Sequence, residues 1–254
     1  MFYKKPDAGH ILCEYGRSSR QALGTRFNLC VWNWHKSKDP GWEKEFLALC
    51  KKADLFAAQE AVFSPETVRL LNRSPFHWSG AVSFLSPRNR IPTGIATGCT
   101  VRSIQTAYKA EIAEPFFKMP KMTMSSLYPL ENGSYLLLLN MHAINFKGNK
   151  AFEQNLAHAE TLLEQFDGPV IAAGDFNAWS GTRTRLLAQA AKRLGLEEVR
   201  FTPDLRTRYL RRPVDFIFTR GLEVTFSRVM ETSASDHNPL LAGFRLPAQR
   251  VSRL

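Results

Sequence analysis

The sequence predicts an α/β fold with mixed β-sheets in a single domain. Apolar runs of strand length alternate with amphipathic segments of helical period along most of the 254 residues. Some strand-like runs follow one another with only a turn between them, as on either side of ENGS (131–134). Such neighbours form antiparallel pairs, so we expect sheets that combine parallel and antiparallel strands.

The predicted strands are apolar runs that are bounded by turn residues. The loop SPRNRIPT (86–93) separates the third from the fourth, and ENGS separates the fifth from the sixth. In chain order the predicted strands lie at 27–33, 54–60, 76–84, 94–102, 121–130, 134–142, 169–177, 214–220, 222–230 and 240–246.

Helices are predicted at 41–52, 65–73, 150–166 and 182–194. The first has Trp42, Phe46 and Leu49 at helical spacing, and the second begins with Pro65, which suits a first helical turn. The third has the clearest pattern, because one apolar stripe contains Phe152, Leu156, Ala159, Leu163 and Phe166.

The first 26 residues are expected to differ from the rest of the chain. Residues 1–26 are polar and basic without a hydrophobic period, so we expect an irregular N-terminal arm there and one domain over 27–254.

No apolar signal core and no run of membrane-spanning length is visible. The four cysteines show no C-x-x-C spacing. These features predict a reduced, cytoplasmic protein without a transmembrane segment, and no stable protein partner is implied.

The net charge of +11 favours polyanionic partners. Nucleic acid, phosphorylated substrates and anionic membranes all fit, and a basic surface that serves only solubility is the alternative. Two basic loops are candidates for substrate binding. One is SPRNRIPT and the other is RFTPDLRTRYLRRP (200–213); the expected phosphate contacts are Arg88, Arg90, Arg208, Arg211 and Arg212.

Polar side chains lie at or near the ends of several predicted strands. Asp175 and Asn177 follow the run PVIAAG, and in strand geometry residues i and i+2 face the same way. Ligands of α/β folds bind at the carboxyl ends of strands. A single G-D-x-N is as often a polar turn, but further clusters of this kind contain Asn33, Glu60, His142, Asp215 and the triplet Ser235, Asp236 and His237.

The chemistry of these clusters converges on phosphoester hydrolysis. Carboxylate and amide oxygens are ligands for magnesium, manganese or calcium, and structural zinc prefers softer donors. His142 and His237 add groups that transfer a proton or bind a phosphate oxygen near neutral pH. The set therefore suits attack of water on a phosphoester beside a hard cation.

The order of the motifs resembles the endonuclease/exonuclease/phosphatase superfamily, which includes deoxyribonuclease I. The motifs are W-N (32–33), Q-E (59–60), N-x-H (140–142), G-D-F-N (174–177), V-D-F (214–216) and S-D-H (235–237). The stretches NMHAINF, GDFNAWS and ASDHNPLL further resemble a bacterial YafD-like branch. The resemblance implies a four-layer α/β sandwich, with two mixed sheets face to face and helices outside. It also implies a Mg²⁺- or Mn²⁺-dependent phosphodiesterase or phosphatase.

The resemblance also implies roles for single residues. Glu60 matches the principal metal ligand, Asn33 the asparagine beside it, and Asp236 the aspartate that completes the metal region. Asp175 and Asn177 match the pair that orients the nucleophilic water and the phosphate.

Three further motif residues match the proton-transfer and phosphate positions. His237 matches the catalytic histidine, with Asp215 as its orienting partner. His142 matches a phosphate-contacting histidine of the deoxyribonuclease and sphingomyelinase branches, which argues against an AP endonuclease. Inositol polyphosphate phosphatases have a longer W-C-D-R signature where this chain has RPVDFIF.

We expect a nuclease that hydrolyses DNA or RNA by activated water attack. The alternatives are a phospholipid or sphingomyelin phosphodiesterase or a small-molecule phosphatase of the same superfamily. A lipid enzyme needs an exposed apolar hairpin, and AEPFFKMPKM (113–122), with Phe116 and Phe117, is the candidate. A third hypothesis is a non-catalytic nucleic-acid-binding protein. His10, His35, His77 and His158 have no partner motif and are not expected to be catalytic.

Overall fold

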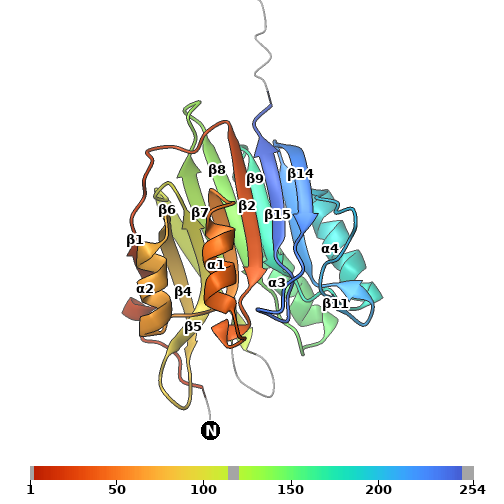
Figure 1. Ribbon diagram of the computed structural model, residues 1–254. Helices are drawn as coiled ribbons and strands as arrows, with labels where there is room; N and C mark the ends of the chain where they lie inside the picture. Colours follow the sequence, from red (N-terminus) through yellow and green to blue (C-terminus); the bar gives the residue numbers. More distant parts are fainter. Residues whose placement is uncertain (1–2, 114–119, 248–254) are drawn as a thin grey trace, which may run out of the picture.

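The computed structural model describes residues 3–113 and 120–247, and these form two β-sheets packed face to face. Helices α1 and α2 lie on one outer side and α3 and α4 on the other (Figure 1). Three apolar layers separate these four layers of secondary structure: one lies between the sheets and one lies under each helix pair. The predicted four-layer α/β sandwich is therefore confirmed.

The first sheet has seven strands, and β2 and β3 form its parallel pair. Its other neighbouring pairs are antiparallel. In spatial order the strands are β1 (Leu12–Gly16), β4 (His77–Leu85), β5 (Pro92–Cys99), β3 (Leu55–Val62), β2 (Arg26–Asn33), β15 (Leu240–Arg245) and β14 (Glu223–Val229).

The second sheet has six strands, and β8 and β9 form its parallel pair. In spatial order they are β10 (Glu197–Glu198), β13 (Asp215–Arg220), β9 (Val170–Asp175), β8 (Tyr135–His142), β7 (Pro120–Pro129) and β6 (Gln105–Ala113). A separate two-stranded hairpin consists of β11 (Arg208–Tyr209) and β12 (Arg212–Pro213).

The helices are α1 (Trp42–Cys50), α2 (Pro65–Arg73), α3 (Asn149–Leu163) and α4 (Gly181–Arg193), with 3-10 turns η1 (Ala8–His10) and η2 (His35–Ser37). Ser64 caps α2 and Ser180 caps α4, because each hydroxyl accepts a hydrogen bond from a backbone N–H of the first turn. No helix in the described ranges has both the length and the apolar character that a membrane span needs.

Successive side chains of a strand point alternately into two different apolar layers. In β2, Leu29 and Val31 point into the layer between the sheets, whereas Cys30 and Trp32 pack under α1. Strand β9 does the same on the other side, with Ile171 and Ala173 facing the first sheet and Val170 and Ala172 facing α3 and α4. Each of these two strands therefore contributes to two apolar layers.

Residues 12–16 correct the expectation of an irregular N-terminal arm over 1–26. They form β1 at the edge of the first sheet, antiparallel to β4. Leu23 is fully buried in the layer between the sheets. The five residues LCEYG of β1 form no uninterrupted apolar run, and β1 alternates only weakly in burial, so the sequence gives little signal for this strand. The assignment of 27–254 to a single domain stays a prediction.

Candidate active site

Register across three strands places three polar side chains next to one another. His142 lies opposite Asp175 in the parallel β8/β9 pair, and Asp215 lies opposite Asp175 in the antiparallel β9/β13 pair. All three are buried. Gly174 has a φ of 139°, and a Cβ there would lie 2.0 Å from the carbonyl oxygen of Met141. The glycine of G-D-F-N is therefore needed for β9 to approach β8 this closely.

The first sheet adds an amide and a carboxylate to this group. Asn33, at the end of β2, donates a hydrogen bond of 3.2 Å from Nδ2 to Asp175 Oδ2 and so joins the two sheets. Glu60 lies in the β3 bulge with a positive φ of 50°. Such backbone strain in a non-glycine residue costs about 1–3 kcal/mol and is concentrated at functional sites. The carboxylate of Glu60 lies 3.9 Å from His142 Nε2.

His237 is hydrogen-bonded to Asp215, with 2.8 Å between Nδ1 and Oδ2. This contact confirms the predicted pairing. Burial lowers the pKa of His237, but the carboxylates of Asp215, Asp175 and Asp236 act in the opposite direction and raise it to about 10. The imidazole is therefore cationic at neutral pH in the metal-free protein and donates Nδ1–H to Asp215.

Hydrogen bonds to β2 hold the loop that contains S-D-H. The indole Nε1 of Trp32 donates to the carbonyl of His237 at 2.9 Å. Ser235 Oγ donates to the carbonyl of Asn33 at 2.7 Å and accepts from the His237 backbone N–H at 3.1 Å. The W-N and S-D-H motifs thus form one hydrogen-bonded unit, although about 200 residues separate them.

Asp236 lies at the exposed rim of the site and is oriented by a histidine. Its side chain is 55% exposed, and its Oδ2 lies 3.2 Å from His35 Nε2. The other ring nitrogen of His35 lies 2.7 Å from Asp39 Oδ2. His35 belongs to η2, where three successive residues have positive φ. Sequence reasoning missed this residue, because a short turn of this kind has no periodic signal.

His142 is neutral and in contact with a lysine that sequence reasoning also missed. Lys121 Nζ lies 2.6 Å from His142 Nε2. Burial lowers the pKa of His142 well below its ordinary value, and the positive charges of Lys121, His237 and Lys36 act in the same direction. His142 Nε2 therefore accepts a hydrogen bond from the ammonium group of Lys121, which brings a second cation to the candidate active site.

Asp175, Asp215 and His237 can share a metal ion. One ligand atom from each lies within 4.8 Å of the others. Burial raises the pKa of Asp175 to about 6, the His237 charge opposes that increase and Asp215 adds to it. Asp215 Oδ1 is buried and accepts no hydrogen bond from the described residues. The group therefore has carboxylate oxygen that a cation can use.

Asn177 differs from the expectation based on strand geometry. Its φ is 48° and β9 ends at Asp175, so the strand geometry in which both side chains would face one way does not continue to Asn177. The Asn177 backbone N–H donates to Asp175 Oδ1 at 3.0 Å, and its Nδ2 donates to the Ala143 carbonyl at 2.9 Å. Buried Arg183 donates to the Asn177 carbonyl at 3.0 Å. Asn177 therefore fixes the Asp175 carboxylate from the turn.

The arginines of 200–213 are partly engaged in ion pairs. Arg206 is buried against Asp204 and Glu198, and Arg208 also pairs with Asp204 at 2.9 Å. The other arginines that the sequence singles out are exposed: Arg211 and Arg212 lie around the β11–β12 turn, and Arg88 and Arg90 lie in the β4–β5 loop. Their contact with substrate stays a prediction.

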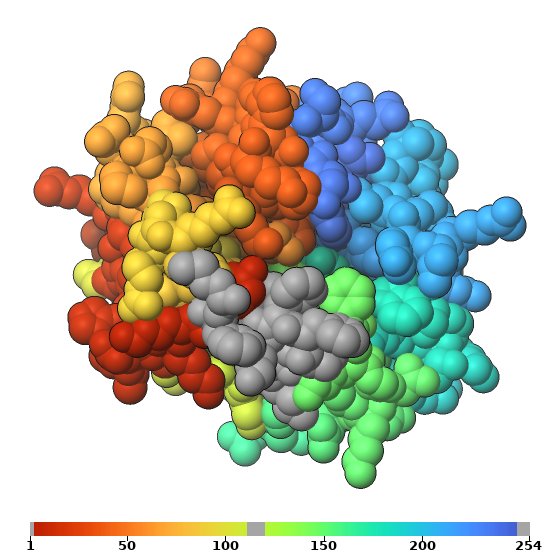
Figure 2. All heavy atoms as spheres, turned by 90° about the horizontal axis from the view of Figure 1, so that it is seen from below, coloured from red at the N-terminus to blue at the C-terminus, as the bar shows by residue number. Residues whose placement is uncertain are grey.

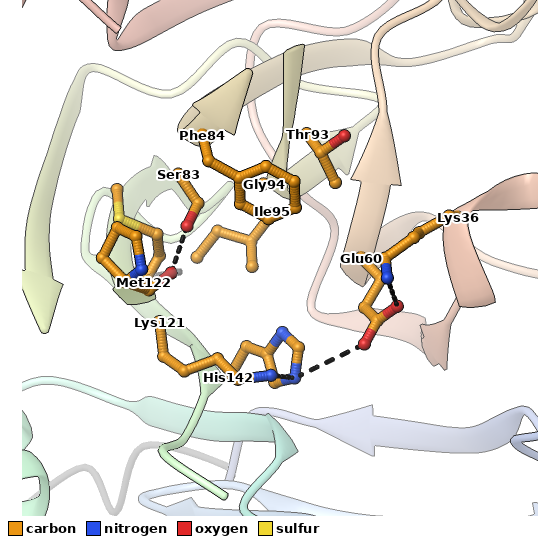
Figure 3. Close-up of a pocket in the computed structure, with 11 residues that line it drawn as sticks. Lys36, Glu60, Ser83, Phe84, Thr93, Gly94, Ile95, Lys121, Met122 and His142 are labelled. Carbon is orange, nitrogen blue, oxygen red and sulfur yellow. Dashed lines mark hydrogen bonds and ion pairs between the residues drawn. The ribbon is translucent and has the colours of Figure 1, made fainter. Parts of the chain in front are cut away.

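A small cavity adjoins this group of polar side chains, and Glu60 and His142 are among the residues that line it (Figure 3). Lys36 reaches Glu60 from η2, and 3.8 Å separate Nζ from Oε2. Like Lys121, Lys36 has no motif signal, because a lone lysine in a basic chain is most often a solvated surface residue.

Comparison with known proteins gives relatives along most of the chain. A UPF0294 protein of Erwinia tasmaniensis is 36% identical over 222 residues, which are 87% of this chain and 82% of that protein. This likeness confirms the resemblance to the YafD-like branch. The structure of ANGEL2, a 2′,3′-cyclic phosphatase, has a TM-score of 0.66 at 15% identity and covers 93% of this chain and 98% of that chain. The human Nocturnin catalytic domain has a TM-score of 0.64 at 17% identity, with 89% and 96% covered.

The sequence model of the Endonuclease/Exonuclease/phosphatase family matches residues 30–237. This range contains all six motifs and most strands of both sheets. The chain therefore belongs to the endonuclease/exonuclease/phosphatase family.

Proposed function

We propose that this protein is a divalent-metal-dependent phosphodiesterase that hydrolyses nucleic acid by attack of an activated water. The observation that carries the proposal is the His237–Asp215 hydrogen bond of 2.8 Å beside the buried carboxylate of Asp175. It combines a cationic proton donor with an acceptor for water in one group. Membership of a family of phosphoester hydrolases supports the reaction class.

The donor set fits Mg²⁺ or Mn²⁺, because carboxylate and amide oxygens dominate it. Since His237 Nδ1 is engaged with Asp215, we assign His237 to proton chemistry. The metal ligands are then Glu60, Asp236 and Asn33, with Asp175 adjacent through its hydrogen bond from Asn33. A bound ion of this kind would stabilise the negative charge that develops on the phosphoryl oxygens.

The other side chains have separate tasks in this proposal. Asp175 accepts a hydrogen bond from the attacking water and takes its proton, a role that its pKa of about 6 supports. His237 donates Nε2–H to a phosphate oxygen, while Asp215 holds the ring. His142 and Lys121 bind the phosphate beside them, and Asn177 keeps Asp175 oriented.

Nucleic acid is the proposed substrate class because of the positive net charge of the chain and because of a similar structure. The net charge of +11 favours a chain with many phosphates. A similar structure is that of ANGEL2, a 2′,3′-cyclic phosphatase, in complex with adenosine-2′,3′-vanadate, which supports a substrate of the nucleotide class here. The competing lipid hypothesis depends on Phe116 and Phe117, which lie outside the described residues. The grouping of Glu60, Asp175 and His237 argues against a non-catalytic binding protein.

The test measures hydrolysis of DNA, RNA, sphingomyelin, a phosphomonoester and bis(4-nitrophenyl) phosphate, with Mg²⁺, Mn²⁺ or EDTA. His237→Ala should reduce the rate by about 10²–10⁴-fold, because it removes a proton-transferring group. His158→Ala, on α3 and outside the site, is the matched control and should keep the wild-type rate. The melting temperature of each variant shows that it is folded.

Each result decides between the hypotheses. Activity that EDTA abolishes and His237→Ala removes supports a metal-dependent phosphodiesterase. If the protein hydrolyses sphingomyelin or the phosphomonoester but not nucleic acid, the lipid or phosphomonoester hypothesis replaces nucleic acid as the substrate class. A His237→Ala variant within a few-fold of wild type would remove His237 from the reaction.

A further inference from the structure

A groove leads away from the catalytic group along the β4–β5 hairpin. Its inner part is the cavity beside Glu60 and His142, with a volume of about 30 Å³, enough for roughly two water molecules (Figure 3). Its outer part is a wider depression of about 500 Å³ between Tyr3 and Arg88. The two parts adjoin each other, because Lys36, Phe84 and Thr93 line both.

The lining of this groove is basic. Lys36, Lys121 and Arg88 line it, and Glu60 at the catalytic end is the single carboxylate residue among the described residues of its walls. A chain of phosphates that enters at Arg88 therefore meets positive charge along the whole path to the reacting centre.

The groove also presents aromatic and apolar surface. The rings of Tyr3 and Phe84 pack edge to face, with 4.7 Å between their centroids. Ile95 and Met122 continue the apolar wall toward His142. Positive charge interleaved with an aromatic platform is typical of sites for single-stranded nucleic acid, where unpaired bases stack and the backbone is neutralised.

A second depression also begins at Lys36, but its charge argues against a polyanion. It runs between α1 and α2 and has a volume of about 790 Å³. The carboxylates of Asp39, Glu43 and Glu66 line it, with Lys44 as a further cation. A phosphate chain that leaves the catalytic group on this side of the molecule is therefore directed along β4 and β5.

We propose that the groove along the β4–β5 hairpin binds the stretch of single-stranded nucleic acid next to the cleaved bond, with phosphates on Lys36 and Arg88 and a base against Tyr3. This rests on the proposed function and names its substrate as a single strand. Duplex is disfavoured, because a paired base must break its pairing and stacking, at a cost of a few kcal/mol, before it can reach the aromatic platform. Figure 2 views the catalytic edge and shows the β4–β5 loop in yellow beside the red N-terminal residues.

The reach of the groove bounds the number of nucleotides. Arg88 lies four residues after Phe84, so at most about 14 Å of extended chain separates them. Phosphates of one strand follow each other by about 3.4 Å along a duplex and are farther apart in an extended strand, so the outer part, from Phe84 to Arg88, holds no more than roughly four nucleotides.

The binding test uses a fluorescently labelled ten-nucleotide single strand, with anisotropy measured in EDTA so that no cleavage occurs. Arg88→Ala should weaken binding at least five-fold, whereas Arg228→Ala is the matched control. It removes the same charge from an exposed position on β14, at the opposite side of the first sheet, and Arg228 lines neither part of the groove. Tyr3→Ala should weaken binding about five-fold or more, and Tyr3→Phe, which keeps the ring, should restore it. Wild type should bind the single strand more tightly than a duplex of the same sequence.

The kinetic test separates this inference from the proposed function. Arg88→Ala should lower kcat/KM for the oligonucleotide and leave hydrolysis of bis(4-nitrophenyl) phosphate unchanged, because the small diester does not reach Arg88. Equal losses of binding in Arg88→Ala and Arg228→Ala, or unchanged binding in all groove variants, would contradict the proposed groove. Hydrolysis of the small diester without any single-strand binding would leave the phosphodiesterase intact and refute only this inference.

Discussion

Glu60 is the residue at which strain, charge and the proposed metal site coincide. Its positive φ of 50° places the carboxylate in the bulge of β3, where Lys36 lies 3.8 Å away. Glu60→Gln removes the charge with little change in volume, so we expect Mn²⁺ affinity and turnover to fall at least ten-fold while the fold is kept. Mn²⁺ titration followed by electron paramagnetic resonance measures this. Glu153→Gln on α3 is the control, and equal affinity in the two variants would exclude Glu60 as a ligand.

Gly174 permits the close approach of β8 and β9 that brings His142 beside Asp175. A Cβ at this position would lie 2.0 Å from the Met141 carbonyl oxygen. We expect Gly174→Ala to lower the free energy of unfolding by roughly 2–4 kcal/mol through overpacking and backbone strain. Gly133→Ala is the control, because Gly133 also has a positive φ but an added Cβ there meets no atom within 4 Å. Urea unfolding that gives equal losses for both would contradict the steric argument.

The sequence predicts motif residues well and their neighbours poorly. Asn33, His142 and Asp215 stand at strand ends, so their positions follow from pattern and register. Lys121 lies within a strand and meets His142 only through the pairing of β7 with β8. A lysine of this kind has no local signal, because its role depends on which strand becomes its neighbour.

Strand β1 contributes a titrating contact to the first sheet. His77 in β4 is buried, and its Nε2 lies 3.6 Å from Glu14 of β1. Burial lowers the pKa of His77 below its ordinary value, Arg102 acts in the same direction and Glu14 opposes both. The unfolded chain therefore binds a proton more readily, and stability should fall as pH decreases below about 6.5.

Replacement of His77 by glutamine tests this linkage. His77→Gln should flatten the loss of unfolding free energy between about pH 7 and 5, measured by urea unfolding at several pH values. The surface variant His158→Gln should keep the wild-type slope. Parallel curves for wild type and His77→Gln would show that His77 does not couple the fold to pH.

Strands that are continuous apolar runs are predicted within a few residues of their observed bounds, as β2, β8 and β9 illustrate. The edge strands β1, β6 and β10 are not predicted, because none of them is an uninterrupted apolar run, whereas the edge strand β14 is predicted at 222–230. Strand β6 combines Tyr108 with exposed Lys109 and Ala110, and β1 alternates only weakly in burial. The short strands β11 and β12 lie in an arginine-rich segment that has no hydrophobic periodicity.

The site spans both sheets, so metal binding should stabilise the whole molecule. An ion that binds only the folded state at 100 times its Kd adds about 2.7 kcal/mol to the unfolding free energy. We expect Mn²⁺ to raise the melting temperature equally by circular dichroism and by tryptophan fluorescence. The fluorescence reports the layer under α1, where Trp32, Trp34, Trp42 and Trp78 cluster. A shift in one signal only would show that the sheets respond separately.

Each sheet combines strands from the N-terminal part of the chain with strands from the C-terminal part. The first sheet is completed by β14 and β15 from the C-terminal part, and the second by β6 and β7 from the N-terminal part. A break in the exposed turn at 131–134 would therefore leave two fragments, each of which lacks strands that only the other supplies. The fragments would stay interlocked as a non-covalent pair, and the catalytic group would assemble only in that pair, since Asn33 and Glu60 come from one fragment and Asp175 and His237 from the other. The topology thus makes this protein a natural two-part complementation system.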